Sequence, residues 1–155
     1  MSDAYVTALR MLAGRELSAA QLRQRLGRRR LEPADIDEAV DRLRAEGAID
    51  DDRVARAIAR VSTGVKRRGR LRVRREIEQA GIASATARRV VDEAFAEIDA
   101  DALLDAALAK RLRGSARIVD DAQFARLYRF LINQGFEADK VAAALRKRRK
   151  GKEDD

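Results

Sequence analysis

The chain has 155 residues, of which 46% are hydrophobic and 39% charged, and its 34 Lys and Arg against 26 Asp and Glu give a formal charge of +8. It contains neither Cys nor His, which excludes disulfides, zinc sites of the usual nitrogen and sulfur type, and every Ser-His or Cys-His catalytic arrangement. We therefore expect neither an enzyme nor a bound cofactor, and the apolar content is high enough for an ordered domain.

The N-terminal segment, residues 1–12, carries Asp3 and Arg10 within a short apolar run. A secretion signal would keep such a run free of charge, and no stretch of the chain approaches the roughly 20 apolar residues of a membrane span. The pattern favours a cytoplasmic protein that does not associate with membranes.

Apolar residues recur at helical spacing along nearly the whole chain, and strand signals are nearly absent. Ser18 and Gln21 fit a capping box, Pro33 suits the first position of a helix, and the acidic run Asp50–Asp52 suits another helix start. These signals predict an all-α protein with helices at 4–13, 18–29, 33–46, 51–66, 70–80, 84–97, 99–113, 120–134 and 137–149.

The apolar pattern also repeats. Spacings of 4, 5, 5 and 4 residues occur three times, at Leu22, Leu26, Leu31, Ile36 and Val40, at Val73, Ile77, Ile82, Ala87 and Val91, and at Leu127, Leu131, Phe136, Val141 and Leu145. Each i, i+4 pair lies on one helix face, and Gly81 and Gly135 can adopt the positive φ of the turn between two helices. We predict a tandem array of three three-helix repeats, elongated and curved, at 1–49, 50–98 and 99–149, with a charged mobile tail at 150–155.

Two segments partly resemble ligand-binding motifs, one for a metal ion and one for phosphate, but each lacks required residues. The run Asp50–Asp52 has no second acidic cluster that would complete an oxygen cage for a metal, so we interpret it as helix capping. The segment 64–69 has two glycines five residues apart but lacks the Lys-Ser or Lys-Thr pair of a phosphate-binding loop. The sequence predicts no metal site and no ATP site.

Basic residues gather in three blocks, one in each predicted repeat. The middle block, 66–75, holds seven cations and no anion, and such a segment repels itself unless it meets negative charge. We therefore predict that the blocks bind nucleic acid or an acidic protein surface. The candidate residues are Arg25, Arg28, Arg29 and Arg30; Lys66, Arg67, Arg68, Arg70, Arg72, Arg74 and Arg75; and Arg146, Lys147, Arg148 and Arg149.

Aromatic residues are too few for base stacking to be the main binding device, because the chain has no Trp, two Tyr and four Phe. Phe124, Tyr128 and Phe130 lie at helical spacing, which favours a role in the core. An exposed cluster that binds a partner is the alternative for these three side chains.

Three segments of the chain resemble the RecX family of regulatory proteins. Residues 47–55 (GAIDDDRVA) are similar to the family's glycine and paired-aspartate stretch, Gly69 with residues 76–82 (EIEQAGI) is similar to its second stretch, and residues 130–136 (FLINQGF) are similar to its third. The resemblance covers about residues 4–149 and implies tandem three-helix repeats.

The resemblance also implies a function, negative modulation of RecA. The protein would lie in the groove of the RecA-DNA filament and limit filament growth, strand exchange, ATP hydrolysis and LexA self-cleavage. RecA is then the expected partner, single- or double-stranded DNA phosphates are a second expected contact, and we expect a monomer.

Two alternatives remain open at this point. Residues 18–47 could form a helix-turn-helix regulator with 34–44 as recognition helix, although that helix is acidic and a DNA groove is lined by phosphate. The other alternative is a Mg²⁺-dependent carboxylate enzyme, which requires Asp or Glu side chains that converge in a pocket.

Overall fold

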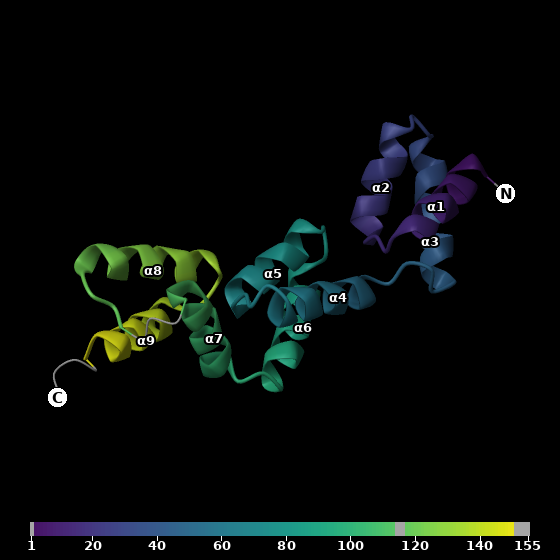
Figure 1. Ribbon diagram of the computed structural model, residues 1–155. Helices are drawn as coiled ribbons and strands as arrows, with labels where there is room; N and C mark the ends of the chain where they lie inside the picture. Colours follow the sequence, from purple (N-terminus) through teal and green to yellow (C-terminus); the bar gives the residue numbers. More distant parts are fainter. Residues whose placement is uncertain (1, 114–116, 151–155) are drawn as a thin grey trace. The chain divides into compact units, whose positions relative to one another are not determined.

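A computed structural model describes residues 2–113 and 117–150, and within these ranges the chain is all-α (Figure 1). All the predicted helices form, with ends within two residues of the predicted ones, so the predicted fold class is confirmed. Residues 151–155 of the predicted tail lie outside the described residues. The helices are α1 (Asp3–Gly14), α2 (Ala19–Arg28), α3 (Pro33–Ala45), α4 (Asp51–Gly64), α5 (Arg70–Gln79), α6 (Ser84–Ala96), α7 (Ala100–Leu112), α8 (Asp121–Asn133) and α9 (Ala138–Lys150).

The chain divides into two compact units. Unit 1 comprises residues 1–58 and 76–90, and unit 2 comprises residues 59–75 and 91–155. The chain therefore passes from one unit to the other three times, within α4, α5 and α6. The division into three repeats at 1–49, 50–98 and 99–149 stays a prediction.

The helix starts use the capping residues that the sequence predicted. The Gln21 amide N–H donates to Ser18 Oγ at 3.1 Å, and the Ser18 N–H donates to Gln21 Oε1 at 3.0 Å, which completes the capping box of α2. Pro33 occupies the first turn of α3, and Asp50 caps α4 by accepting the Arg53 N–H at 3.1 Å. Because these donors have no partner within their own helices, capping by side chains stabilises each helix start.

In unit 1, α1, α2 and α3 pack on one apolar core. Leu22, Leu26, Ile36 and Val40 of the repeating pattern are buried there, and Leu31 packs against them half-buried. The i, i+4 pairs therefore face inward as the pattern predicted. Burial of side chains of this size supplies most of the favourable free energy of such a small core.

In unit 2, α7, α8 and α9 enclose a second apolar core. The five pattern residues of this segment, Leu127, Leu131, Phe136, Val141 and Leu145, are all buried. The pattern thus predicted the inward faces of α8 and α9 correctly.

The turn after α8 makes close backbone contact with the start of α5. Gly135 has a φ of +95°, and its neighbour Gln134 accepts the Gly69 N–H at 2.8 Å while Gly135 itself accepts the Leu71 N–H at 3.1 Å. A β-carbon on Gly69 would lie 2.6 Å from the carbonyl carbon of Gly135. The start of α5 can therefore dock on this turn only because both positions are glycine.

Candidate functional site

The first basic block lies at the C-terminal end of α2. Arg25 is half-buried in the last turn of the helix, and Arg28, Arg29 and Arg30 are exposed at and beyond its end. Cations at this end of a helix interact favourably with the helix dipole. Stabilisation of α2 therefore explains part of this basic block without a binding partner.

Arg30 has an unusual backbone for its residue type. It adopts a φ of +58°, the left-handed conformation that Gly81 and Gly135 adopt at the matching positions of the repeating pattern. A residue with a β-carbon pays roughly 1 kcal/mol or more for this conformation. The turn therefore tolerates an arginine where the other two turns use glycine.

The middle block is divided between a loop and a helix. Lys66, Arg67 and Arg68 lie in the loop between α4 and α5, where Lys66 is exposed and the two arginines are half-buried. Arg67 adopts a left-handed φ of +51°. The other members lie on α5, where Arg75 is exposed and Arg70, Arg72 and Arg74 are half-buried.

Contacts inside the chain occupy part of the middle block. Arg70 forms an ion pair with Asp92, and Arg72 Nη1 donates to the Asn133 carbonyl at 3.0 Å and to Gln134 Oε1 at 3.3 Å. The sequence showed no anion within this segment, but the fold supplies one for Arg70, a carboxylate 22 residues further along the chain. Arg70 and Arg72 join α5 to other parts of unit 2 as well as adding to the positive surface.

The third block lies in the last turns of α9. Arg146, Lys147 and Arg149 are exposed, and Arg148 is half-buried. Arg149 pairs with Asp121 of α8 and lies 5.9 Å from the centre of the Phe124 ring. The outer end of α9 is therefore fixed to α8, while Arg146 and Lys147 project into solvent.

Sequence reasoning missed a second group of cations that the fold brings to the middle block. Lys66 and Arg67 line a pocket of about 220 Å³ together with three cations from the end of α7. Ala107, Phe130 and Gln134 complete the lining. The basic run 110–113 was the available sequence signal for the missed residues, which are Lys110, Arg111 and Arg113.

The acidic run Asp50–Asp52 has structural roles. Asp50 caps α4, Asp51 Oδ1 accepts the Ala19 N–H at 2.9 Å, and Asp52 pairs with Arg89 at 2.7 Å. No group of three or more Asp or Glu side chains could hold a metal ion in the part of the chain that the structure describes. Asp50 thus has the predicted capping role at the start of α4, whereas Asp51 and Asp52 contact other helices.

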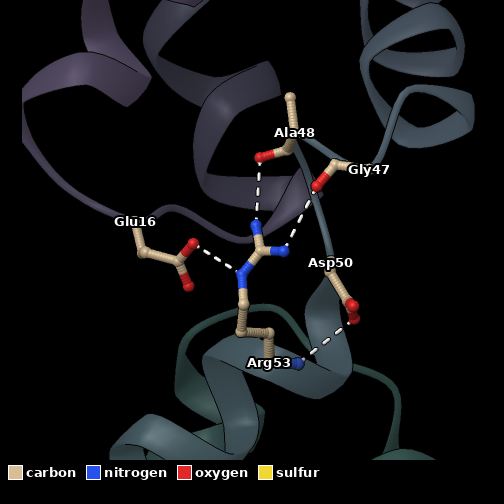
Figure 2. A network of polar contacts seen from close by, with 5 residues as sticks. All are labelled: Glu16, Gly47, Ala48, Asp50 and Arg53. Atoms are coloured by element: carbon tan, nitrogen blue, oxygen red, sulfur yellow. Dashed lines mark hydrogen bonds and ion pairs between the residues drawn. The ribbon is translucent and has the colours of Figure 1, made fainter.

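Arg53 is the centre of a polar network beside this run (Figure 2). Its Nε donates to Glu16 Oε1 at 2.7 Å, and its two terminal nitrogens donate to the carbonyls of Gly47 and Ala48 at 3.2 and 3.3 Å. Its backbone N–H reaches Asp50 Oδ1. The guanidinium thus ties α4 to the turn after α3, within the first family-like segment, residues 47–55.

The aromatic side chains on α8 are half-buried. Phe124, Tyr128 and Phe130 pack against the core of unit 2 without being enclosed by it. Phe130 also faces the Arg111 guanidinium, which lies 4.6 Å from its ring centre. The predicted core role therefore holds in part, because the three side chains pack on the core and keep some exposed surface.

The clearest electrostatic shifts are in unit 1. Tyr5 Oη donates to Glu46 Oε2 at 2.7 Å, Arg42 Nε donates to Glu46 Oε1 at 2.9 Å, and the Arg42 guanidinium lies 4.1 Å from the centre of the Tyr5 ring. These two hydrogen bonds, first the one from Tyr5, hold the pKa of Glu46 below its ordinary value. The same bond to Glu46 raises the pKa of Tyr5. The cluster joins the start of α1 to the end of α3.

These observations define the class of protein. It is an all-α helical-repeat protein with clustered basic side chains at helix ends and in loops. Within 2–113 and 117–150, no helix has both the length and the apolar content of a membrane span.

Comparison with known proteins identifies the family. Residues 4–43 match the family model for the first three-helix domain of RecX. The regulatory protein RecX of Halorhodospira halophila is 34% identical over 138 residues, which is 88% of this chain and 83% of the relative. RecX of Chlorobium phaeobacteroides is 32% identical over 145 residues, 92% of this chain and 91% of that protein. The chain belongs to the RecX family.

Solved structures show the same fold. The crystal structure of RecX from Lactobacillus salivarius superposes with a TM-score of 0.72 at 17% identity and covers 93% of both chains. A second crystal structure of a regulatory protein RecX gives a TM-score of 0.73 at 18% identity, over 93% of this chain and 70% of the other. The predicted all-α helical-repeat fold is thereby confirmed.

Proposed function

We propose that this protein is a cytoplasmic negative regulator of the RecA recombinase and has no enzymatic activity of its own. As a monomer, it binds in the groove of the RecA-DNA filament and limits filament extension, strand exchange, ATP hydrolysis and LexA co-protease activity. Family membership is the observation that carries this proposal, since two RecX regulatory proteins align over most of the chain.

The surface charge supports the proposal. Arg75, Arg146 and Lys147 are exposed cations of unit 2, and Arg28 and Arg29 are exposed cations of unit 1. Exposed cations of this kind speed association with an acidic protein or with DNA phosphates, because long-range attraction raises the encounter rate. A filament of protein and DNA offers both kinds of negative partner.

A helix-turn-helix regulator fits these observations less well. Its recognition helix would be α3, whose exposed face carries Asp35, Asp37, Glu38 and Asp41. Asp37 and Asp41 are both paired with Arg23, but Asp35 and Glu38 would meet phosphate directly in a DNA groove. A regulator that acts through a protein filament avoids this repulsion.

RecA-dependent ATP hydrolysis on single-stranded DNA, with and without the protein, tests the proposal. We expect the native protein to inhibit hydrolysis and the double variant Arg75→Glu/Lys147→Glu to need a roughly tenfold higher concentration, because two attractive charges become repulsive. These two positions are preferable to Arg70 and Arg72, whose contacts within unit 2 would also be lost.

The matched control is Arg44→Glu/Arg88→Glu. Both residues are exposed, Arg44 in the last turn of a helix like Lys147 and Arg88 within a helix like Arg75, and both lie outside the basic blocks. The control should inhibit like the native protein. Absence of inhibition by the native protein would overturn the proposed function, and equal weakening by both variants would overturn the assignment of the blocks.

A further inference from the structure

The pocket beside the middle block concentrates positive charge from two distant parts of the chain. Of the eight described residues that line it, five are cations and none is acidic. Lys66 and Arg67 come from the loop before α5, and Lys110, Arg111 and Arg113 come from the end of α7. Among the described residues, no carboxylate forms an ion pair with any of these five side chains. The pocket is therefore built to attract an anion.

Helix stability explains only part of this charge. Lys110, Arg111 and Arg113 lie at the C-terminal end of α7, where cations favour the helix dipole. Lys66 and Arg67 likewise follow the end of α4, but the dipoles of α4 and α7 do not require their two groups of cations to line one pocket. Arg67 and Arg113 both adopt left-handed backbones, with φ of +51° and +50°. Glycine or asparagine would fit these conformations at lower cost, so both arginines carry a conformational penalty, as Arg30 does.

The uncharged residues of the pocket indicate which chemical groups the ligand carries next to its anionic group. Phe130 and Ala107 form an apolar wall, and the Phe130 ring lies under the Arg111 guanidinium at 4.6 Å. Gln134 Oε1 accepts from Arg72 at 3.3 Å, so the amide nitrogen of Gln134 is the group that remains able to donate. An apolar wall, an arginine guanidinium and several phosphate-binding donors together suit a nucleotide unit.

The size of the pocket favours a segment of a polymer. Its volume of about 220 Å³ is below the roughly 300–1,000 Å³ of pockets that enclose whole small ligands. A phosphodiester with an adjoining sugar or base edge needs less room, because the remainder of the strand continues outside. A duplex keeps its bases stacked on one another, whereas a single strand can place a base or sugar against the apolar wall and the Arg111 guanidinium.

We propose that this pocket binds the backbone of single-stranded nucleic acid, with Lys66, Arg67 and Arg111 on the phosphate and Phe130 against the adjoining base or sugar. The proposal concerns direct binding by the protein alone. It can therefore fail while the proposed action on RecA stands.

The test measures fluorescence anisotropy of a labelled oligothymidylate of about 20 nucleotides, longer than the ~16 that one small site covers. The native full-length protein is titrated without RecA across a salt series. The variant is Arg67→Gln/Arg111→Gln, and the matched control is Arg44→Gln/Arg88→Gln, which removes the same charge from exposed helix positions of unit 1. Gln and Arg have a similar energetic cost in the left-handed backbone at position 67. Thermal melting by circular dichroism checks that each variant is folded.

We expect the pocket variant to bind about tenfold more weakly, since hydrogen bonds to charged groups are lost. Its salt dependence should also fall by about 0.7 in slope for each lost phosphate contact on a single strand. The control should bind like the native protein. Equal affinity of the pocket variant and the control would overturn the proposal, as would preferential binding of a duplex of the same length.

A competitor identifies the chemistry of the ligand. An oligoglutamate peptide of matched charge carries anions without a sugar-phosphate backbone or base faces. We expect the peptide to displace the labelled strand only when its carboxylates are at a much higher concentration than the phosphates of an unlabelled strand that displaces it equally. Equal displacement would assign the pocket to acidic protein segments and overturn a nucleic-acid site.

Discussion

At the scale of single residues, backbone space decides which substitutions the fold accepts. Gly135 combines a φ of +95° with a β-carbon position already filled by the backbone of Arg72. Gly27 lies within α2 and has no atom within 4 Å of the corresponding position. The two glycines should therefore respond to alanine in opposite directions.

Gly135→Ala should lower the free energy of unfolding by about 3 kcal/mol, because it adds overpacking to left-handed strain. Gly27→Ala should raise it by about 0.5–1 kcal/mol, because alanine is the better helix former. Urea unfolding followed by circular dichroism measures both. A stabilised Gly135→Ala would contradict the backbone contact between α5 and the turn after α8.

The Tyr5, Arg42 and Glu46 cluster makes stability depend on pH. The pKa of Glu46 is lowered in the folded state, so the cluster stabilises the fold above the ordinary pKa of glutamate. This contribution is lost as pH falls through the lowered folded-state pKa. At neutral pH, Glu46→Gln should melt at a lower temperature than the native protein.

The two proteins should approach the same melting temperature in strong acid, where Glu46 is protonated in both the folded and unfolded states. Glu32→Gln, which alters an exposed carboxylate of unit 1 without a capping hydrogen bond, is the control. A native-to-variant difference that stays constant down to strong acid would show that Glu46 acts only through packing.

At the scale of helices, the most informative position is the start of α2. Ser18 is fully buried, accepts the Gln21 N–H, and donates its hydroxyl to the carbonyl of Ala80. Ser2 caps α1 in the same way by accepting the Tyr5 N–H at 3.2 Å, but it is exposed. Ser18 thus has a second, buried hydrogen-bond partner, whereas the side chain of Ser2 makes only the capping hydrogen bond.

Ser18→Ala should cost about 2–3 kcal/mol in the free energy of unfolding, since it removes a cap and leaves the Ala80 carbonyl without that partner. Ser2→Ala should cost about 1 kcal/mol or less, the contribution of a cap alone. Chemical denaturation of the two variants side by side gives the comparison. Equal losses would mean that the bond to Ala80 contributes nothing.

Helix positions were predictable because they depend on local chemistry. The capping box at Ser18 and Gln21, the proline at position 33 and the glycine turns each specify a boundary within a few residues. The left-handed Arg30 was not predictable, because arginine has no preference for that conformation.

The candidate site was predictable only in part. The basic blocks were visible as runs of charge, but the pairing of Arg70 with Asp92 depends on how α5 and α6 pack. The pocket joins Lys66 and Arg67 to a segment more than 40 residues away. Such a meeting is a property of the tertiary fold, and no local spacing encodes it.

At the scale of the whole molecule, the path of the chain limits how it can be divided. Unit 2 contains residues 59–75 as well as 91–155. A fragment that starts at residue 99 therefore lacks Gly69 and Leu71, whose N–H groups donate to Gln134 and Gly135. It also lacks Lys66 and Arg67 of the pocket.

The fragment 59–155 should therefore be more stable than 99–155, by about 1–3 kcal/mol for the two backbone hydrogen bonds alone. Thermal melts of the two purified fragments make the comparison. If 99–155 melts at the same temperature as 59–155, residues 59–75 do not belong to the stable unit.

The approach of Gly69 to Gly135 also has an evolutionary consequence. Each glycine is required because a neighbouring backbone fills the space of its β-carbon, and no change of side chain at one position can create room at the other. The two positions should therefore stay fixed independently among homologues rather than change in compensating pairs. Methods that infer contacts from correlated substitutions should miss this contact, although the two backbones are joined by hydrogen bonds.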